Sequence, residues 1–231
     1  MTVAKNRADR VMLYHISWEQ FENLLKDLGE HRAARLAYDR TTLEIMTPLP
    51  EHEHYKEVIG DLVKEIADVL DLDYESYGST TWKRESRMAG VESDNCFYFQ
   101  NEAAIRGRLD LDLRQDPPPD LALEIDITSK SLNRFPIYAR LGVPELWCYD
   151  SGELKIYLLQ NGEYVESENS LVFSTLAIRY LPKLIEQNRA DGRRAIRQAV
   201  REWVRKGGKG ELPSRPIRKL ASQYLQGFDT S

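Results

Sequence analysis

The stretch that decides the fold is Pro119-Asp120-Leu-Ala-Leu-Glu124-Ile-Asp126. Its charged and its large aliphatic residues fall on alternate positions. Successive side chains of a β-strand point to opposite faces, so Asp120, Glu124 and Asp126 share one face. Three carboxylates on one face of a central strand repel one another and lose hydration, and a bound Mg²⁺ would relieve both penalties. The alternative is an edge strand whose polar face meets water.

Helix and strand patterns surround this stretch. Apolar residues at helical spacing predict helices over residues 17–29, 51–70, 132–141 and 190–206. Runs rich in β-branched, aromatic and aliphatic residues predict strands over residues 34–39, 42–46, 74–80, 95–99, 121–127, 144–149 and 154–159. This mixture predicts an α/β (α+β) fold, with a central mixed β-sheet flanked by helices.

The charge is unevenly distributed along the 231 residues. The chain carries a formal charge of −5, which divides into −12 for residues 1–186 and +7 for residues 187–231. We therefore expect two parts, an acidic domain over 1–186 and a basic helical C-terminal extension over 187–231. Such an extension binds nucleic acid, packs against its own acidic body or remains solvated.

Composition excludes several classes of protein. The 42% hydrophobic content is enough for a packed core, and no run of eighteen apolar residues predicts a membrane-spanning helix. The first ten residues lack the apolar segment of a secretory signal. Cys96 and Cys148 are too few for a disulfide scaffold, so we expect core cysteines and a cytoplasmic protein.

A second acidic position stands at the start of a predicted strand. Asp94 closes the segment Gly90-Val-Glu-Ser-Asp94 and precedes the apolar run 95–99. An aspartate there often only caps a turn. Together with Glu124, however, it predicts a pair of carboxylates on neighbouring strands.

These motifs, in this order, resemble the Uma2 family of restriction-endonuclease-like proteins. The family belongs to the PD-(D/E)XK nuclease superfamily and is numerous in cyanobacteria. Three segments carry the resemblance, which covers about residues 15–165: Gly90–Asp94 with Cys96-Phe-Tyr98, Pro118–Glu124, and Tyr138–Trp147. The resemblance implies a restriction-endonuclease-like core.

The resemblance also implies roles for individual residues. Asp94 and Glu124 match the family acids, although Ser93 stands where proline is usual, and Asp120 and Asp126 could hold waters or a second ion. Arg134, four residues before Tyr138, stands where lysine is usual, and it can supply positive charge but not move a proton. Glu51 and His52, after Pro50, match the opening of the long helix and could orient the nucleophile. The implied metal ligands are Asp94, Asp120, Glu124 and Asp126.

Two functions follow from these residues. The first is a Mg²⁺- or Mn²⁺-dependent endonuclease that hydrolyses double-stranded DNA and acts as a homodimer. The second, favoured by Arg134 and Ser93, is a non-catalytic descendant used in DNA binding, dimerisation or regulation. DNA binding by an acidic body needs arginines and lysines, which we expect near the acids (Lys83, Arg84, Arg87, Arg106, Arg108) and along one face of the predicted last helix.

Overall fold

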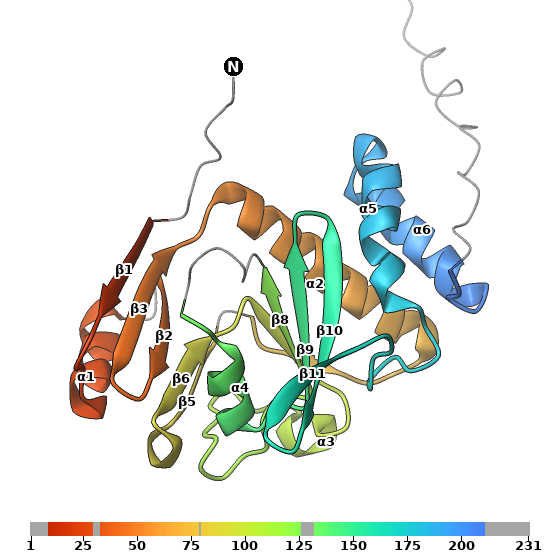
Figure 1. The fold of residues 1–231 in the computed structure, drawn as a ribbon. Coiled ribbons are helices and arrows are strands. Elements are labelled where there is room, and N and C mark those ends of the chain that lie inside the picture. The colour runs from red at the N-terminus through yellow and green to blue at the C-terminus, as the bar shows by residue number, and fades with distance from the viewer. Residues whose placement is uncertain (1–8, 30–32, 79, 126–131, 211–231) are drawn as a thin grey trace, which may run out of the picture.

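The structure is a computed structural model that describes residues 9–29, 33–78, 80–125 and 132–210. Two β-sheets stand side by side with helices on their faces (Figure 1). The predicted mixed α/β class is therefore confirmed. The expected central sheet is divided into two separate sheets.

The first sheet has five antiparallel strands in the order β1-β3-β2-β6-β5. They are β1 (Asp9–Leu13), β2 (Arg35–Asp39), β3 (Thr42–Thr47), β5 (Thr81–Arg84) and β6 (Ala89–Glu92). Strands β2 and β3, both predicted from the sequence, form a hairpin in which Arg40 takes a positive φ of 59°. One face of this sheet packs on α1 (Trp18–Leu28) through Phe21 and Tyr38, whose rings stack at 4.7 Å.

The second sheet has six strands in the order β11-β10-β9-β8-β7-β4. They are β4 (Glu75–Ser76), β7 (Asn95–Tyr98), β8 (Leu121–Ile125), β9 (Glu145–Asp150), β10 (Glu153–Gln160) and β11 (Glu163–Ser167). Only β8 and β9 pair in parallel, so the sheet is mixed, as the sequence predicts. The turn at Asn161 and Gly162, both with positive φ, closes the hairpin of β10 and β11.

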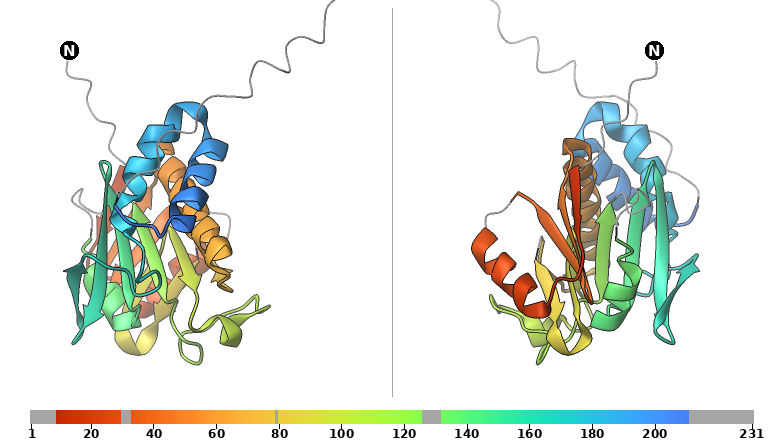
Figure 2. Two further views of the ribbon diagram at one scale, coloured as in Figure 1. Left: turned by 90° about the vertical axis from the view of Figure 1, so that its right-hand side faces the viewer. Right: turned by 60° about the vertical axis from the view of Figure 1, so that its left-hand side comes forward.

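Helices cover both faces of the second sheet. On one face lie α2 (Pro50–Leu70), α5 (Leu181–Asn188) and α6 (Arg193–Arg205), which share one core with Leu121, Leu123 and Ile125 of β8. Figure 2 shows α5 and α6 beside α2 from two further directions. On the opposite face, α4 (Phe135–Leu141) packs between β6 and β11, so it fills the space between the sheets.

Several short elements complete the fold. These are α3 (Glu102–Ile105) and three 3₁₀ turns at Glu85–Arg87, Ile178–Tyr180 and Arg189–Asp191. Helix α1 begins with a capping box, in which Ser17 and Gln20 bond each other's backbone N–H groups. Helix α2 agrees with its predicted range to within one residue.

Three predicted elements are shorter than expected. The strand predicted over 74–80 is limited to Glu75–Ser76, because the chain leaves the second sheet there and joins the first at Thr81. The helix predicted from residue 132 begins at Phe135, where Pro136 fits the first turn. The helix predicted over 190–206 begins at Arg193, because Gly192 has a φ of 84°.

The described part of the predicted C-terminal extension packs against the body. The apolar face of α6 is buried on α2, with Trp203 only 1% exposed. Arg197 and Arg201 of α6 each donate to Glu65 of α2, which is itself buried. Of the roles considered for the extension, packing on its own acidic body is therefore the one seen for residues 193–205.

Candidate active site at the junction of the two sheets

Asp94 lies where the chain crosses from the first sheet to the second. It stands in the two-residue link between β6 and β7, and its side chain is fully buried. The Oδ2 atom accepts a hydrogen bond of 2.6 Å from the Ile125 backbone N–H. Its other oxygen pairs with the guanidinium group of Arg35. Asp94 therefore ties the end of β8 to the first sheet.

Glu124 lies next to Asp94 because of the strand register. Asn95 pairs with Leu123 in the antiparallel ladder of β7 and β8, so the next step along the ladder brings Asp94 beside Glu124. Glu124 is also fully buried. Its Oε2 accepts from Nη1 of Arg134 at 2.5 Å, and its Oε1 accepts from the Tyr138 hydroxyl. The predicted pairing of two acids on neighbouring strands is thus seen in the fold.

The β2–β3 hairpin contributes one acidic and one basic side chain to the surroundings of Asp94 and Glu124. Arg35 begins β2, and Glu44 lies in the middle of β3, fully buried. Glu44 accepts from Nη2 of Arg134 at 3.4 Å and from the Leu132 backbone N–H at 2.9 Å. Arg134 therefore bridges one acid from each sheet. We name the group Arg35, Glu44, His52, Asp94, Glu124 and Arg134 the junction cluster.

His52 and Glu51 take different positions in the first turn of α2. His52 is 8% exposed, and its Nε2 lies 3.2 Å from Oδ2 of Asp94. Burial, together with the charges of Arg35 and Arg134, lowers the pKa of His52 to about 4, so the imidazole is neutral at pH 7. Glu51 is exposed and lines a cavity that His52 also reaches.

Glu53 extends the cluster toward solvent. Its carboxylate pairs with Arg35 and, at 3.2 Å, with Lys56. Partial burial raises its pKa, but these two cations outweigh the burial and leave the pKa below its usual value. Glu53 therefore adds negative charge to the solvent side of Arg35.

Asp120 does not join the junction cluster. Its oxygens accept hydrogen bonds from the Phe99 backbone N–H, at 2.7 Å, and from the backbone and side chain of Asn101. It precedes β8, four residues from Glu124, which corresponds to about 13 Å along a strand. Asp120 thus holds the turn after β7. Asp126, the fourth predicted ligand, lies outside the described residues.

The junction cluster suits a divalent cation in charge and ligand type. Its three carboxylates (Glu44, Asp94, Glu124) face two guanidinium groups, which leaves a formal charge of −1 with His52 neutral, and carboxylate oxygens are the ligands that Mg²⁺ prefers. Within the described part of the chain, no three His, Cys, Asp or Glu side chains are grouped to hold a metal. Asp94 and Glu124 would hold the ion, in exchange for contacts with Arg35 and Arg134.

Most of the basic residues expected to bind DNA near the acids are engaged in pairs. Lys83 bonds Glu22 at 2.7 Å, and Arg84 donates to the Leu113 carbonyl. Arg106 pairs with Glu102 and Asp73, and Arg108 pairs with Asp116. Their positive charge is therefore partly neutralised by neighbouring acids.

Arg35, Glu44 and Tyr138 belong to the site although the sequence did not predict them there. A weak signal for Glu44 was present, because it interrupts a strand of apolar residues, Leu43 to Met46. Tyr138 lies in a segment that carries the family resemblance, and its hydroxyl donates a hydrogen bond to Glu124. Among the residues described, Cys96 lies in the core as expected, and no helix is long and apolar enough to cross a membrane.

Comparison with known proteins supports the resemblance drawn from the motifs. A crystal structure described as "a putative nuclease belonging to DUF820" from Anabaena variabilis ATCC 29413 is similar, with 17% identity and a TM-score of 0.45 over 68% of this chain and 88% of that one. No curated protein matches. The model of the Uma2 family, described as "Putative restriction endonuclease", matches residues 18–187. The chain therefore belongs to the Uma2 family.

Proposed function

We propose that this protein is a Mg²⁺-dependent endodeoxyribonuclease that hydrolyses phosphodiester bonds of double-stranded DNA. The observation that carries the proposal is the burial of Asp94 beside Glu124, at the junction of the two sheets, in a member of this family. Buried carboxylates lose hydration, and such a pair is retained where a cation or another partner compensates for it. Mn²⁺ has similar ligand preferences and is expected to substitute.

Several residues would have distinct roles in this reaction. A bound cation would polarise the phosphodiester and lower the pKa of a water molecule. Asp94 and Glu124 would hold the cation. The neutral imidazole of His52 lies with Nε2 3.2 Å from Oδ2 of Asp94 and would position that ligand, and Glu51, which lines the cavity in the same helix turn, would orient the attacking water. Arg134 remains charged at every working pH and would stabilise negative charge on the phosphate.

Plasmid nicking is the direct test. Supercoiled DNA is incubated with wild-type protein, Asp94→Asn and Glu124→Gln, with Mg²⁺, with Mn²⁺ or with a chelator. Nicking should require the metal and fall at least 100-fold in either variant, because each removes one charged ligand. Glu163→Gln, an exposed acid on β11, is the control and should retain activity. Nicking that survives Glu124→Gln would contradict the assignment.

A second function is favoured by the ion pairs themselves. Arg35 holds Asp94, and Arg134 holds Glu124, so the acids are already compensated within the chain. A non-catalytic module that binds DNA or dimerises would need no metal. Calorimetric titration with Mn²⁺ separates the two: binding that is lost in Asp94→Asn favours the nuclease, and no binding at millimolar Mn²⁺ favours the module.

We also propose that the chain acts as a homodimer on DNA. Cleavage of both strands of a duplex is served by two copies related by a two-fold axis. Sedimentation equilibrium with and without a duplex oligonucleotide tests this, and a mass of one chain under both conditions would refute it.

A further inference from the structure

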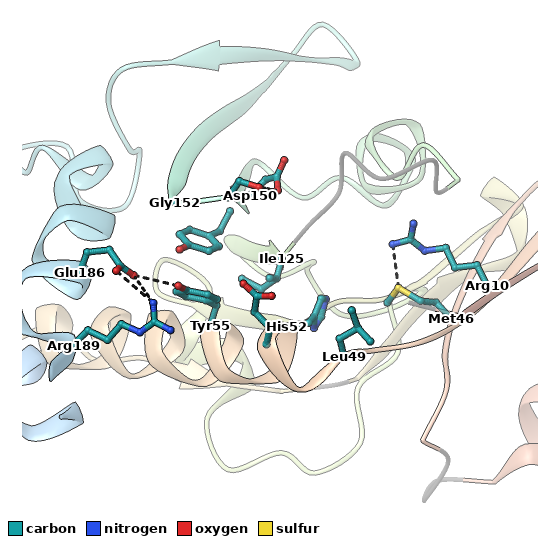
Figure 3. A pocket seen from close by; sticks show the side chains of 13 residues that line it. Arg10, Met46, Leu49, His52, Tyr55, Ile125, Asp150, Gly152, Glu186 and Arg189 are labelled. Carbon is teal, nitrogen blue, oxygen red and sulfur yellow. Dashed lines mark hydrogen bonds and ion pairs between the residues drawn. The ribbon is translucent and has the colours of Figure 1, made fainter. Parts of the chain in front are cut away.

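A cavity opens beside the junction cluster. Its volume is about 330 Å³, and it lies between the start of α2, the turn that joins β9 to β10, and the end of α5 (Figure 3). His52 and Ile125 belong to its wall, and both contact Asp94. His52 and Ile125 therefore stand between the cavity and Asp94, one of the proposed cation ligands.

The wall of the cavity combines aromatic rings with carboxylates. Tyr55 of α2 and Tyr149 of β9 lie with ring centroids 4.6 Å apart and ring planes inclined by 35°. Glu186 accepts a hydrogen bond of 3.2 Å from the Tyr55 hydroxyl and lies 3.5 Å from Arg189 at the rim. Asp150 and Glu51 add two further carboxylates to the wall.

We propose that this cavity receives one unstacked base of the DNA substrate, an inference that rests on the proposed nuclease function. Aromatic side chains provide a surface for a heteroaromatic ring. Carboxylates accept hydrogen bonds from the amino group of adenine, cytosine or guanine, and thymine has no such group. The cavity therefore favours a base that carries an exocyclic amine over thymine, which offers a carboxylate only its N3–H.

The distribution of charge fixes the orientation of the nucleotide. Three carboxylates (Glu51, Asp150, Glu186) and two arginines (Arg10, Arg189) line the cavity, and this lining has a net negative charge, which disfavours a phosphate in the ring-binding part. The wall at His52 leads to Asp94, where the proposed cation would attract the phosphate. The volume agrees with this arrangement, because it stands near the lower end of the range for small-ligand sites and admits little more than one nucleoside.

Binding of free nucleosides tests the inference without cleavage. Saturation-transfer NMR titrations of the full chain with 2′-deoxyguanosine and with thymidine are run without divalent ions. Deoxyguanosine should bind more tightly than thymidine. Tyr55→Leu should weaken deoxyguanosine binding roughly tenfold because the ring is lost, while Tyr55→Phe should remain within about twofold of wild type.

Exposed variants keep the test independent of folding. Glu186→Gln lies on the surface side of α5 and should bring deoxyguanosine down toward the affinity of thymidine. Arg194→Gln, an exposed arginine on α6 outside the cavity, is the matched control and should bind as wild type does. Equal binding of the two nucleosides, or no loss in both Tyr55→Leu and Glu186→Gln, would overturn the inference.

The two proposals fail in different ways. Selective nucleoside binding together with no metal-dependent nicking would remove the nuclease function and keep the base-binding cavity. Metal-dependent nicking that depends on Glu124, with no nucleoside selectivity, would keep the nuclease and remove the cavity from its mechanism.

Discussion

Replacing Arg134 by methionine should destabilise the protein strongly. Arg134 is 4% exposed, and it bonds Glu124 at 2.5 Å and Glu44 at 3.4 Å. Methionine fills similar space without charge, so two buried carboxylates would lose their shared cation. Breaking a buried ion pair from one side costs about 3–5 kcal/mol. For a domain of this size, that corresponds to a fall in Tm of roughly 6–20 °C.

A double-mutant cycle isolates the cause. Unfolding in urea, followed by the fluorescence of the buried tryptophans, is compared for wild type, Arg134→Met, Glu124→Gln and the double variant. Glu124→Gln removes the charge that Arg134 compensates. The double variant should therefore lose about 1–3 kcal/mol less unfolding free energy than the two single variants lose when their losses are added. Arg179→Met, which breaks a pair with Glu166 and Glu168 on the surface, should cost less than about 1 kcal/mol. Additive effects in the cycle, or a small effect of Arg134→Met, would refute the reasoning.

Three further predictions concern other buried groups. The folded pKa of His52, about 4, is below its ordinary value of 6.5, so the unfolded chain binds more protons than the folded one between these values. The free energy of unfolding should therefore rise with pH across this window and fall by up to about 3 kcal/mol as the pH is lowered through it. This pH dependence should disappear in His52→Gln, as measured by urea titration at several pH values. Glu65→Gln should weaken the hold of α2 on Arg197 and Arg201 and increase amide exchange in α6. Glu145→Gln should lose acceptors for Leu171 and Val172 and cost about 1–3 kcal/mol in thermal unfolding.

The elements were predictable from sequence because their signals are local. Periodicity predicted α2 to within one residue, and runs of strand-forming residues predicted β2, β3, β9 and β10 to within one residue at each end. The association of Asp94 with Glu124 was also predictable, since Asp94 directly precedes one strand and Glu124 lies on the next, and these two strands pair.

The partners of these acids could not be predicted, because they depend on long-range packing. Glu44 is 90 residues from Arg134, and Arg35 meets Asp94 only after β2 has paired with β6. Asp120 lies on the same face of the alternating pattern as Glu124. The pattern alone does not reveal that its carboxylate oxygens accept hydrogen bonds from the turn after β7. The split into two sheets is likewise a matter of strand order, which local sequence does not fix.

The packing of α6 shows that the folded unit extends beyond the residues that the family model matches. Similarity to the family stops at residue 187, yet Val200, Trp203 and Val204 complete the core that α2 shares with β8. The segment that the family has in common is therefore smaller than the segment that folds together. Cutting the chain at residue 187 would expose the apolar side of α2, so loss of DNA binding after truncation would report unfolding. Charge reversal at exposed arginines of α6, with the helix left in place, is the way to learn whether this late part of the chain meets DNA.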